Sequence, residues 1–356
     1  MPKKLLYYIV PILQISTITF IDNPWMILWS IYVIIPLLDE KLSFDYYNPK
    51  QTKELENDIS YKIPLYLVIV LDWCLMFTVL NHLTQNDVSW FDTIGLMSIW
   101  GGLSSNNFTV GHELLHKDTP LDKFLGTYTL VKSLYCHYNI EHVFTHHRYV
   151  GTPLDAVSAE KGQSLHSFIP KAIFIQWKEA WKQKKKMQRY TILNILMCIF
   201  IYRIYSIKGF IYFLIQVYQS IAYLEASNYI EHYGLRRKLL ENNEYEQISD
   251  HHSWNAPHRI TNHLLFKLQR HSDHHKYPSK PYQILEIDPE SPILPCGYLV
   301  SIMIAQFPKV WMNIMDPLIT GYKSKQLYEE SRRKVKRFIM KFATFASCLM
   351  IYSLYD

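Results

Sequence analysis

Three short stretches of the chain concentrate histidine at spacings that suit metal binding. They are residues 112–116 (HELLH), 142–147 (HVFTHH) and 271–275 (HSDHH). In the last stretch the histidines stand at i, i+3 and i+4, so a helix would place all three on one face. One such stretch is weak evidence, because scattered histidines are usually surface or core residues. Three of them, holding eight of the 16 histidines, predict a metal site.

The number of histidines indicates more than one metal ion. We add His232, which follows the last of the long apolar runs, as a ninth candidate ligand. Imidazole binds zinc, copper, iron and nickel, so the ligand type alone does not select the metal. A structural zinc ion takes about four ligands and a catalytic one about three, so eight or nine histidines imply two ions. Two redox-active ions that bind O2 beside an apolar cavity are most simply two irons.

The elements that must hold these histidines are apolar helices. Six runs approach the roughly 20 residues that a helix needs to cross a bilayer. They cover residues 5–21, 24–38, 63–80, 90–110, 190–205 and 209–224. Trp25, Trp29 and Trp90 stand near their ends, where aromatic side chains favour the membrane interface. The sequence predicts an all-α integral membrane protein of six transmembrane helices, with residues 1–356 as a single membrane domain.

The distribution of charge predicts the topology of these spans. Lys3 and Lys4 precede the first run and place the N-terminus in the cytoplasm. Six crossings then bring all histidine stretches to the cytoplasmic face, within metal-binding regions 112–189 and 232–290. A basic and apolar tail follows at residues 332–356. We expect its apolar part, 338–355, to lie on the membrane because it contains Lys341 and is barely long enough to cross.

Cysteine usage and charge point to separate partners. The five cysteines are far apart and include no C-x-x-C, which excludes a rubredoxin-type or iron–sulfur site within the chain. Any electron carrier must therefore be another protein. Residues 171–189 carry seven basic side chains and one acid, which equals the whole net charge of +6. Anionic lipid headgroups explain this stretch most simply, and docking of an acidic electron carrier is the alternative. Nucleic acid is not an expected partner.

The chain resembles the integral-membrane alkane monooxygenases, within the wider superfamily of membrane fatty acid desaturases and hydroxylases. Four strings carry the resemblance: HELLHK at 112–117, EHVFTHHR at 141–148, NYIEHYG at 228–234 and LQRHSDHH at 268–275. Softer similarities, among them PLLD at 36–39, TPLD at 152–155 and HSWN at 252–255, run in family order up to about residue 317. The resemblance therefore covers most of the chain.

The resemblance implies a six-helix membrane enzyme with a non-haem di-iron centre. Such enzymes hydroxylate the terminal methyl group of an alkane or similar alkyl chain, using O2 and electrons from a rubredoxin or ferredoxin with its reductase. The substrate would arrive from the bilayer through an apolar tunnel between the spans. The implied iron ligands are His112, His116, His142, His146, His147, His232, His271, His274 and His275.

Several polar residues near these histidines are candidate supporting groups. A side chain next to a ligand on a helix points about 100° away, so each neighbouring acid is expected to support a histidine from another element. Asp155, in the TPLD string, is the favoured acid. Glu225 stands at the end of a predicted span, where an ionisable group is functional by default. The full set is Glu113, Glu141, Asp155, Glu225, Asn228, Glu231 and Asp273.

Other functions remain open from the sequence. Desaturation or hydroxylation of a fatty acyl chain, or hydroxylation of an aromatic methyl group, can use the same ligands. HELLH also matches the H-E-x-x-H motif of zinc metalloproteases, with Glu113 as the base, but that interpretation leaves most other histidines unused. A non-catalytic membrane subunit is the third alternative, and the intact set of nine histidines argues against it.

Overall fold

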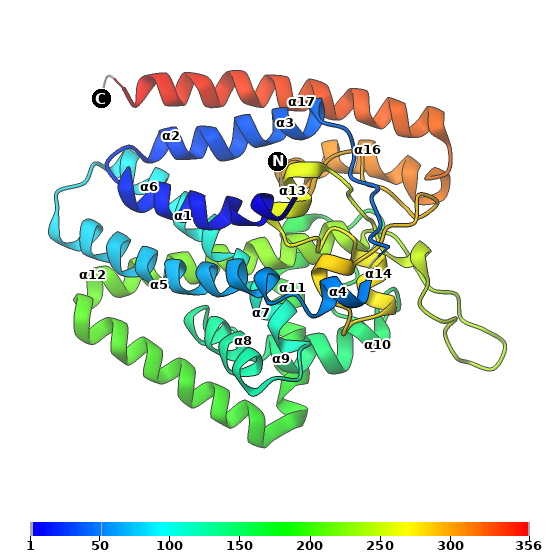
Figure 1. Ribbon diagram of the computed structural model, residues 1–356, viewed down its shortest axis with the longest axis horizontal. Coiled ribbons are helices and arrows are strands. Elements are labelled where there is room, and N and C mark those ends of the chain that lie inside the picture. Colours follow the sequence, from blue (N-terminus) through cyan, green and yellow to red (C-terminus); the bar gives the residue numbers. More distant parts are fainter. Residues whose placement is uncertain (1–2, 51, 355–356) are drawn as a thin grey trace.

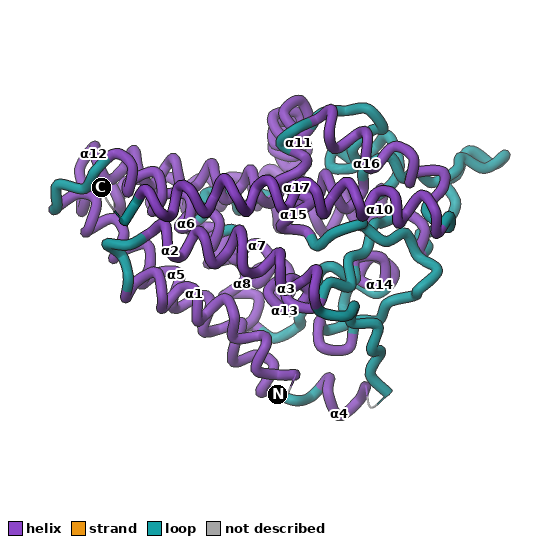
Figure 2. The backbone as a smooth tube through the Cα atoms, turned by 90° about the horizontal axis from the view of Figure 1, so that it is seen from above, coloured by secondary structure: helices purple, strands orange, loops and turns teal. Residues whose placement is uncertain are grey.

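The computed structural model describes residues 3–50 and 52–354 and is built from helices joined by loops. The described residues form no β-sheet, only two isolated bridges. The long helices lie side by side along the longest axis of the molecule (Figure 1), and the loops and several short helices gather at one end of it (Figure 2). The all-α prediction is confirmed, while residues 1, 2, 51, 355 and 356, which include the end of the predicted tail, lie outside the described residues.

The first two apolar runs form a helical hairpin. The first is η1 (Lys3–Tyr8) followed by α1 (Ile9–Thr19). The second is a continuous helix described as α2 (Pro24–Trp29), the π-helical η2 (Ser30–Ile34) and α3 (Ile35–Lys41). Pro24 starts α2, where the missing N–H of proline costs no helical hydrogen bond.

The next two runs lead directly to the first histidine stretch. α5 (Lys62–Gln85) and α6 (Trp90–Ser104) are joined by a short turn, and the Ser89 hydroxyl caps α6 by accepting from the N–H of Asp92 at 3.0 Å. After Ser105 the chain continues as α7 (Asn106–Leu115), which carries His112. α5 and the helical segment Leu165–His232 are long and apolar enough to cross a membrane, and Lys4–Thr19 is a shorter apolar helix.

The apolar runs 190–205 and 209–224 form a hairpin inside α12 (Lys184–His232). Ser206 has φ 52° and ψ −164°, so residues 184–205 and 207–232 form two helices joined at a sharp bend (Figure 1). The chain turns tightly because Gly209 lacks a side chain: a Cβ atom there would lie 2.3 Å from the Cβ of Tyr205. The second half of α12 returns toward the end of the molecule that holds the histidines (Figure 1).

The remaining segments surround this bundle. They are α4 (Thr52–Glu56), η3 (Ile59–Tyr61), α8 (Pro120–Lys132), α9 (Tyr138–Glu141), the π-helical η4 (His142–His146), α10 (His147–Tyr149), α11 (Leu165–Ala180), η5 (Trp181–Gln183), η6 (Asp250–His252), α13 (Arg259–Leu264), α14 (His271–Lys276), η7 (Tyr282–Ile284), α15 (Tyr298–Ala305), α16 (Pro308–Gly321) and α17 (Lys325–Tyr352).

A buried polar cluster fixes the position of α7 in the bundle. Asp72 of α5 forms an ion pair with Lys132 of α8, and both side chains are almost fully buried. The same carboxylate accepts hydrogen bonds from Ser104, at 2.7 Å, and from Asn107 at the start of α7. Four helices are thereby joined at one carboxylate, so the histidines of α7 are held relative to α5 and α8.

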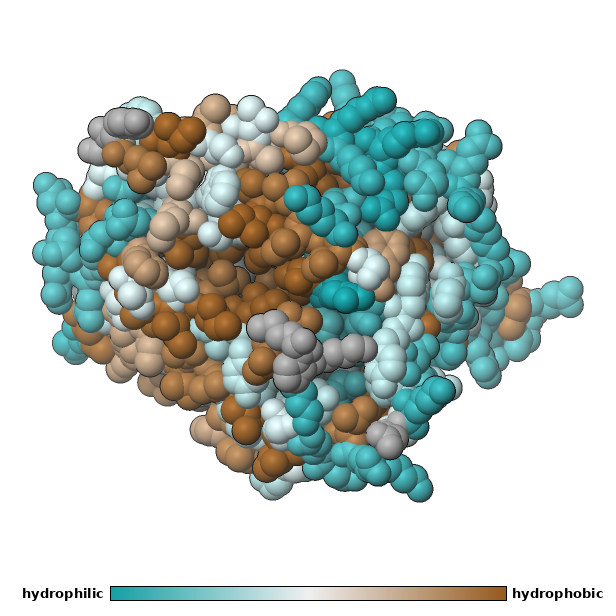
Figure 3. All heavy atoms as spheres, turned by 45° about the horizontal axis from the view of Figure 1, so that its top comes forward, coloured by the Kyte–Doolittle hydropathy of each residue, from teal (hydrophilic) through white to brown (hydrophobic). Residues whose placement is uncertain are grey.

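The face of the molecule drawn in Figure 3 has an apolar middle part and polar edges. Apolar side chains gather over the long helices, polar side chains gather around the end that contains the loops, and a smaller polar group lies at the opposite edge. The exposed apolar residues of the long helices include Ile12, Val70, Ile94, Ile195 and Tyr218. An apolar belt of this kind is expected where helices contact lipid rather than water.

Candidate metal centre

All nine predicted histidines meet in two adjoining groups. Each histidine contributes one ring nitrogen, and within each group these nitrogens all lie within 4.8 Å of one another. The first group is His112, His116, His142, His147 and His274, and the second is His146, His232, His271 and His275. The division into two groups agrees with the two ions that the histidine count predicts.

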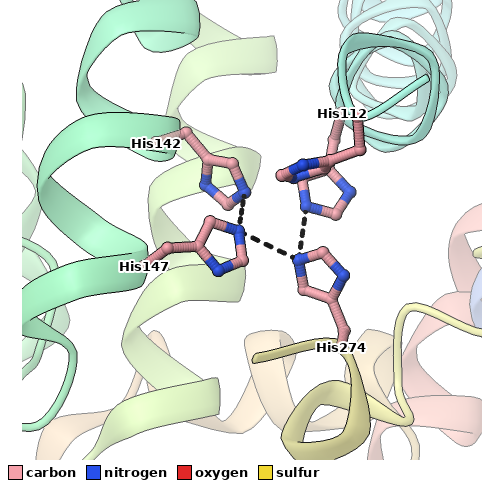
Figure 4. Close-up of side chains that lie close together, drawn as sticks. His112, His142, His147 and His274 are labelled. Carbon is pink, nitrogen blue, oxygen red and sulfur yellow. Dashed lines mark hydrogen bonds between the residues drawn. The ribbon is translucent and has the colours of Figure 1, made fainter. Parts of the chain in front are cut away.

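The spacing of the nitrogens fits shared metal ions. In the first group, Nε2 of His274 lies 2.8 Å from Nε2 of His112 and 3.2 Å from Nε2 of His147, which is 2.9 Å from Nε2 of His142 (Figure 4). Two imidazole nitrogens bound to one ion at about 2.0–2.1 Å would be roughly 2.9–3.4 Å apart.

A row of four Nε2 atoms is poorly explained by hydrogen bonds alone. Each nitrogen carries either one hydrogen or one lone pair, so His147 cannot donate to both of its neighbours. A common cation satisfies every lone pair at once. The second group repeats the arrangement, with Nε2 of His271 at 3.1 Å from His232 and 2.9 Å from His275.

The π-helical turn η4 sends neighbouring histidines to different groups. The N–H of His147 bonds to the carbonyl oxygen of His142, five residues earlier, so this turn holds one residue more than an α-helical turn. His142 and His147 therefore face the first group together, whereas His146, which an ordinary helix would place beside His142, belongs to the second.

The helices α7 and α14 supply most of the other ligands through α-helical spacing. His112 and His116, four residues apart at the end of α7, both belong to the first group. In α14, His271 and His275 are four apart and belong to the second group, while His274 points to the first. One short helix therefore reaches both groups and holds them next to each other.

Burial keeps these imidazoles in the neutral form that binds metals. Loss of hydration lowers the pKa of His116 to about 4. Burial, reinforced by neighbouring histidines, lowers the pKa well below its ordinary value for His112, His142, His147, His271, His274 and His275. A neutral imidazole offers a lone pair without first releasing a proton, so both groups are prepared for cations at neutral pH.

Asp155 orients one histidine of the second group. The Nδ1–H of His146 donates to Oδ2 of Asp155 at 3.0 Å, which leaves Nε2 directed at the group. The carboxylate also accepts from the hydroxyl of Ser158 at 2.6 Å and from the N–H of Val157 at 3.2 Å. This hydrogen bond has the arrangement that commonly fixes the tautomer of a metal-binding histidine.

Of the four acids adjacent to ligands, only Glu231 lies near a histidine. Its Oε2 is 3.5 Å from Nε2 of His271, so its carboxylate stands at the edge of the second group. Tyr298 lies beside the same carboxylate, and its hydroxyl donates to the carbonyl oxygen of Trp254 at 3.4 Å.

The other three acids have partners other than a histidine. Glu113 pairs with Lys117 at 2.7 Å and accepts from the N–H of Tyr282. Glu141 bonds to Thr145, within its own turn. The carboxylate of Asp273 pairs with Lys280 and accepts from the N–H of Glu286, both at 2.8 Å. These contacts hold the chain around the site instead of a ligand.

Glu225 and Asn228 belong to a separate buried network. The carboxylate of Glu225 accepts from the hydroxyl of Tyr135 at 2.9 Å, from Nε2 of Gln176 at 2.7 Å and from Nδ2 of Asn228 at 3.1 Å. These bonds join α12 to α11 and to the loop after α8. The three donors satisfy the hydrogen-bonding capacity of the Glu225 carboxylate within the protein. Glu225 therefore links these elements to one another beside the metal centre.

Two residues that position α14 were not among the predicted site residues. Asn255 donates to the hydroxyl of Ser272 at 2.5 Å and accepts from its N–H at 3.1 Å. The buried guanidinium of Arg270 donates to the carbonyl oxygens of Leu285, at 2.7 Å, and Asp45, at 2.9 Å. Both lie in the HSWN and LQRHSDHH strings, so the motifs contained a signal for them, although no spacing rule assigned them a role.

Comparison with known proteins agrees with this site. The fatty acid desaturase family profile matches residues 89–287, which include all nine histidines. The chain is 34% identical to alkane 1-monooxygenase 2 of Pseudomonas aeruginosa over 86% of each chain. It is 33% identical to alkane 1-monooxygenase 2 of Alcanivorax borkumensis over 87% of each.

A more distant relative is the hydroxylase component of the xylene/toluene monooxygenase of Pseudomonas putida. It is 27% identical over 58% of each chain. The family match and the long match to the alkane enzymes lead to one assignment: the chain belongs to the fatty acid desaturase family and, within it, to the alkane 1-monooxygenases, a family of oxidoreductases.

Proposed function

We propose that this chain is a non-haem di-iron monooxygenase that hydroxylates the terminal methyl group of an alkane or alkyl chain. The observation that carries the proposal is the pair of buried histidine groups, five and four residues strong, in a chain of the alkane 1-monooxygenase family. The proposed ligands are those nine histidines. Nine nitrogen donors without a cysteine suit two irons that stay bound through a redox cycle.

The chemistry of an unactivated methyl group requires such a centre. When bound, two irons supply the activation of O2, with electrons from a separate carrier such as a rubredoxin or ferredoxin. The residues of the chain hold and orient the metals, and their burial excludes water from the reactive site. Asp155 fixes the orientation of His146, and the Glu231 carboxylate offsets part of the positive charge beside His271.

A narrow apolar cavity supports an alkyl substrate. It has a volume of about 80 Å³ and is lined by Ile31, Leu103, Leu264, Leu299 and Ile302 among others. Its lining also includes Asn106, which begins the helix of His112, and Tyr298, which lies beside Glu231. None of its lining side chains is charged, so a saturated chain fits better than an ionic one.

We further propose that the long helices cross the membrane six times, at the predicted spans, with the histidines and the N-terminus on the cytoplasmic side. The apolar surface over the long helices in Figure 3 supports their position in the membrane, since lipid would cover it, and the lysines before the first run support the cytoplasmic side. The substrate would then leave the bilayer sideways and reach the metals without passing through water.

The test is product identification with the iron-loaded protein. Purified protein receives octane or hexadecane with O2 and a reducing system of reductase and rubredoxin. A primary alcohol, absent with His274→Ala, is the expected product. An alkene would favour desaturation. Turnover of xylene but of neither alkane would favour the aromatic-methyl function suggested by the Pseudomonas putida relative.

A further inference from the structure

The C-terminal helix α17 lies lengthwise along the bundle instead of across its end. Arg332 pairs with Glu40 of α3 at 2.7 Å, and Ser347 accepts from Nε1 of Trp29 at 2.9 Å. These pairs make α17 antiparallel to the helix of α2, η2 and α3. Figure 1 shows the two running side by side from the end that holds the histidines to the opposite end.

The last turn of α17 reaches the opposite end of the bundle. The ring of Tyr352 packs edge-on against that of Phe91, with 5.2 Å between centroids. Phe91 is in the first turn of α6, directly after the turn that follows α5. α17 therefore reaches from its contact with Glu40 to its contact with Phe91, which is the same depth as that of the second predicted span.

The exposed face of α17 changes character along its length. Arg333, Lys336, Arg337 and Lys341 are exposed in the first part. Residues 342–352 contain no charge, and their exposed side chains are apolar or small, among them Cys348 and Ile351. A helix that rests on the membrane surface keeps a polar face along its whole length, whereas one that enters the hydrocarbon loses it.

The inner face of this apolar part forms one wall of a second cavity. The cavity has a volume of about 270 Å³ and lies between Phe342, Phe345, Ala346 and Leu349 of α17 and Trp25, Leu28 and Trp29 of α2. Three of its lining residues, Tyr32, Ser98 and Tyr223, also line the narrow inner cavity. The two cavities therefore adjoin, and the hydroxyls of Tyr32 and Tyr223, 2.6 Å apart, stand where they meet.

We propose that the apolar part of α17 is inserted in the membrane beside the second span and walls a port through which the alkyl substrate passes from the bilayer to the inner cavity. The occupant is a saturated alkyl chain, because the lining is apolar and aromatic and continues into a cavity without charge. The substrate part of this inference rests on the proposed function. In place of a tail that lies on the membrane, the chain has an additional helix that ends on the side opposite to the histidines.

Reporter fusions test the insertion without any need for catalysis. In a bacterial host, alkaline phosphatase and green fluorescent protein are fused in turn after Asp356 and, as the matched control, after Lys336. We expect opposite results at the two positions, since one lies before and the other after the crossing. The same active reporter at both positions would overturn the insertion.

Photolabelling tests the port on the full-length protein. A hexadecane analogue that carries a diazirine should label α17 and Met303, and excess hexadecane should compete with it. Ala346→Trp should reduce this labelling about tenfold by filling the cavity, whereas Thr344→Trp, on the exposed face of the same helix, should not. Equal labelling of the two variants would overturn the port. Absence of alcohol formation with normal labelling would instead contradict the proposed function and leave the port standing.

Discussion

Asp155 and His146 lie nine residues apart and form a 3.0 Å hydrogen bond that aims one imidazole at the second histidine group. We expect Asp155→Asn to weaken metal binding there by about 10–100-fold, because an amide neither holds the Nδ1–H as strongly nor raises the basicity of the ring. Iron content measured after dialysis against a graded chelator would show it. Asp118→Asn, at a fully exposed carboxylate, is the control. Equal iron retention by both variants would mean that Asp155 plays no part in holding the metal.

Ligands and other buried histidines should differ in their effect on metal content. His275→Ala removes a nitrogen from the second group and should lower bound iron from two ions toward one per chain. His263 is equally buried but bonds through Nδ1 to the carbonyl oxygen of Arg259 at 2.7 Å, outside both groups. His263→Ala should therefore keep both ions. Metal analysis by mass spectrometry decides, and loss of iron from both variants alike would argue for general destabilisation.

The ion pair of Asp72 and Lys132 should matter for stability more than for chemistry. Lys132→Met leaves a buried carboxylate without its charged partner and should cost about 3–5 kcal/mol. The double variant Asp72→Leu/Lys132→Met removes both charges and should regain part of that loss. Thermal unfolding in detergent measures the difference. A single variant as stable as the wild type would show that the four-helix junction does not depend on this pair.

Acid should destabilise the metal-free protein through its buried histidines. Burial lowers the pKa of His137 to about 4, against an ordinary value of 6.5. As the pH falls from 6.5 toward 4, this histidine binds a proton in the unfolded chain but stays neutral in the folded chain. The free energy of unfolding therefore falls by up to about 1.4 kcal/mol per pH unit for this group. Below about pH 4 both forms are protonated and the effect of this group levels off.

Substitution separates the contribution of His137 to this pH dependence from that of the other histidines. His137→Gln should flatten the fall of the melting temperature between pH 6.5 and 4.5, whereas His166→Gln, at an exposed position, should leave it unchanged. Identical pH profiles for His137→Gln and the wild type would contradict the assigned pKa.

The junction between the two cavities offers a test of substrate passage. A Cβ atom at Gly102 would lie 3.6 Å from Oη of Tyr32 and 3.9 Å from Cε2 of Tyr223, which is ordinary contact. Gly102→Ala should therefore behave like the wild type, while Gly102→Leu should fill the junction and lower kcat/KM for hexadecane about tenfold at unchanged iron content. Steady-state rates together with metal analysis would check this, and equal rates for both variants would exclude the route.

The helical fold and the members of the metal centre could be predicted because both depend on local spacing. Apolar runs define helices, the turn at Ser206 follows from two runs too close to be anything but a hairpin, and all nine histidines meet as expected. The acids beside ligands could not be assigned in the same way. The partners of Glu113, for example, include Tyr282, which is distant in the sequence and brought close only by packing.

The contacts of the C-terminal helix also depended on tertiary structure. Lys341 and the short apolar run favour a helix that lies on the membrane surface, whereas the bonds of Arg332 and Ser347 place α17 along the second predicted span. The division of the histidines into groups of five and four could not be predicted from spacing either. A spacing of four residues pairs His142 with His146, but the π-helical turn pairs His142 with His147 instead.

The extra residue in the turn at 142–146 has a consequence for how such a site can change. Suppose that one residue between His142 and His146 were deleted and the turn became an ordinary α-helix. The ring of His147 would then still lie beside that of His142, whereas His146 would lose its position opposite Asp155. The capacity of this chain for a second ion therefore depends on the winding of a single turn as much as on how many imidazoles it encodes.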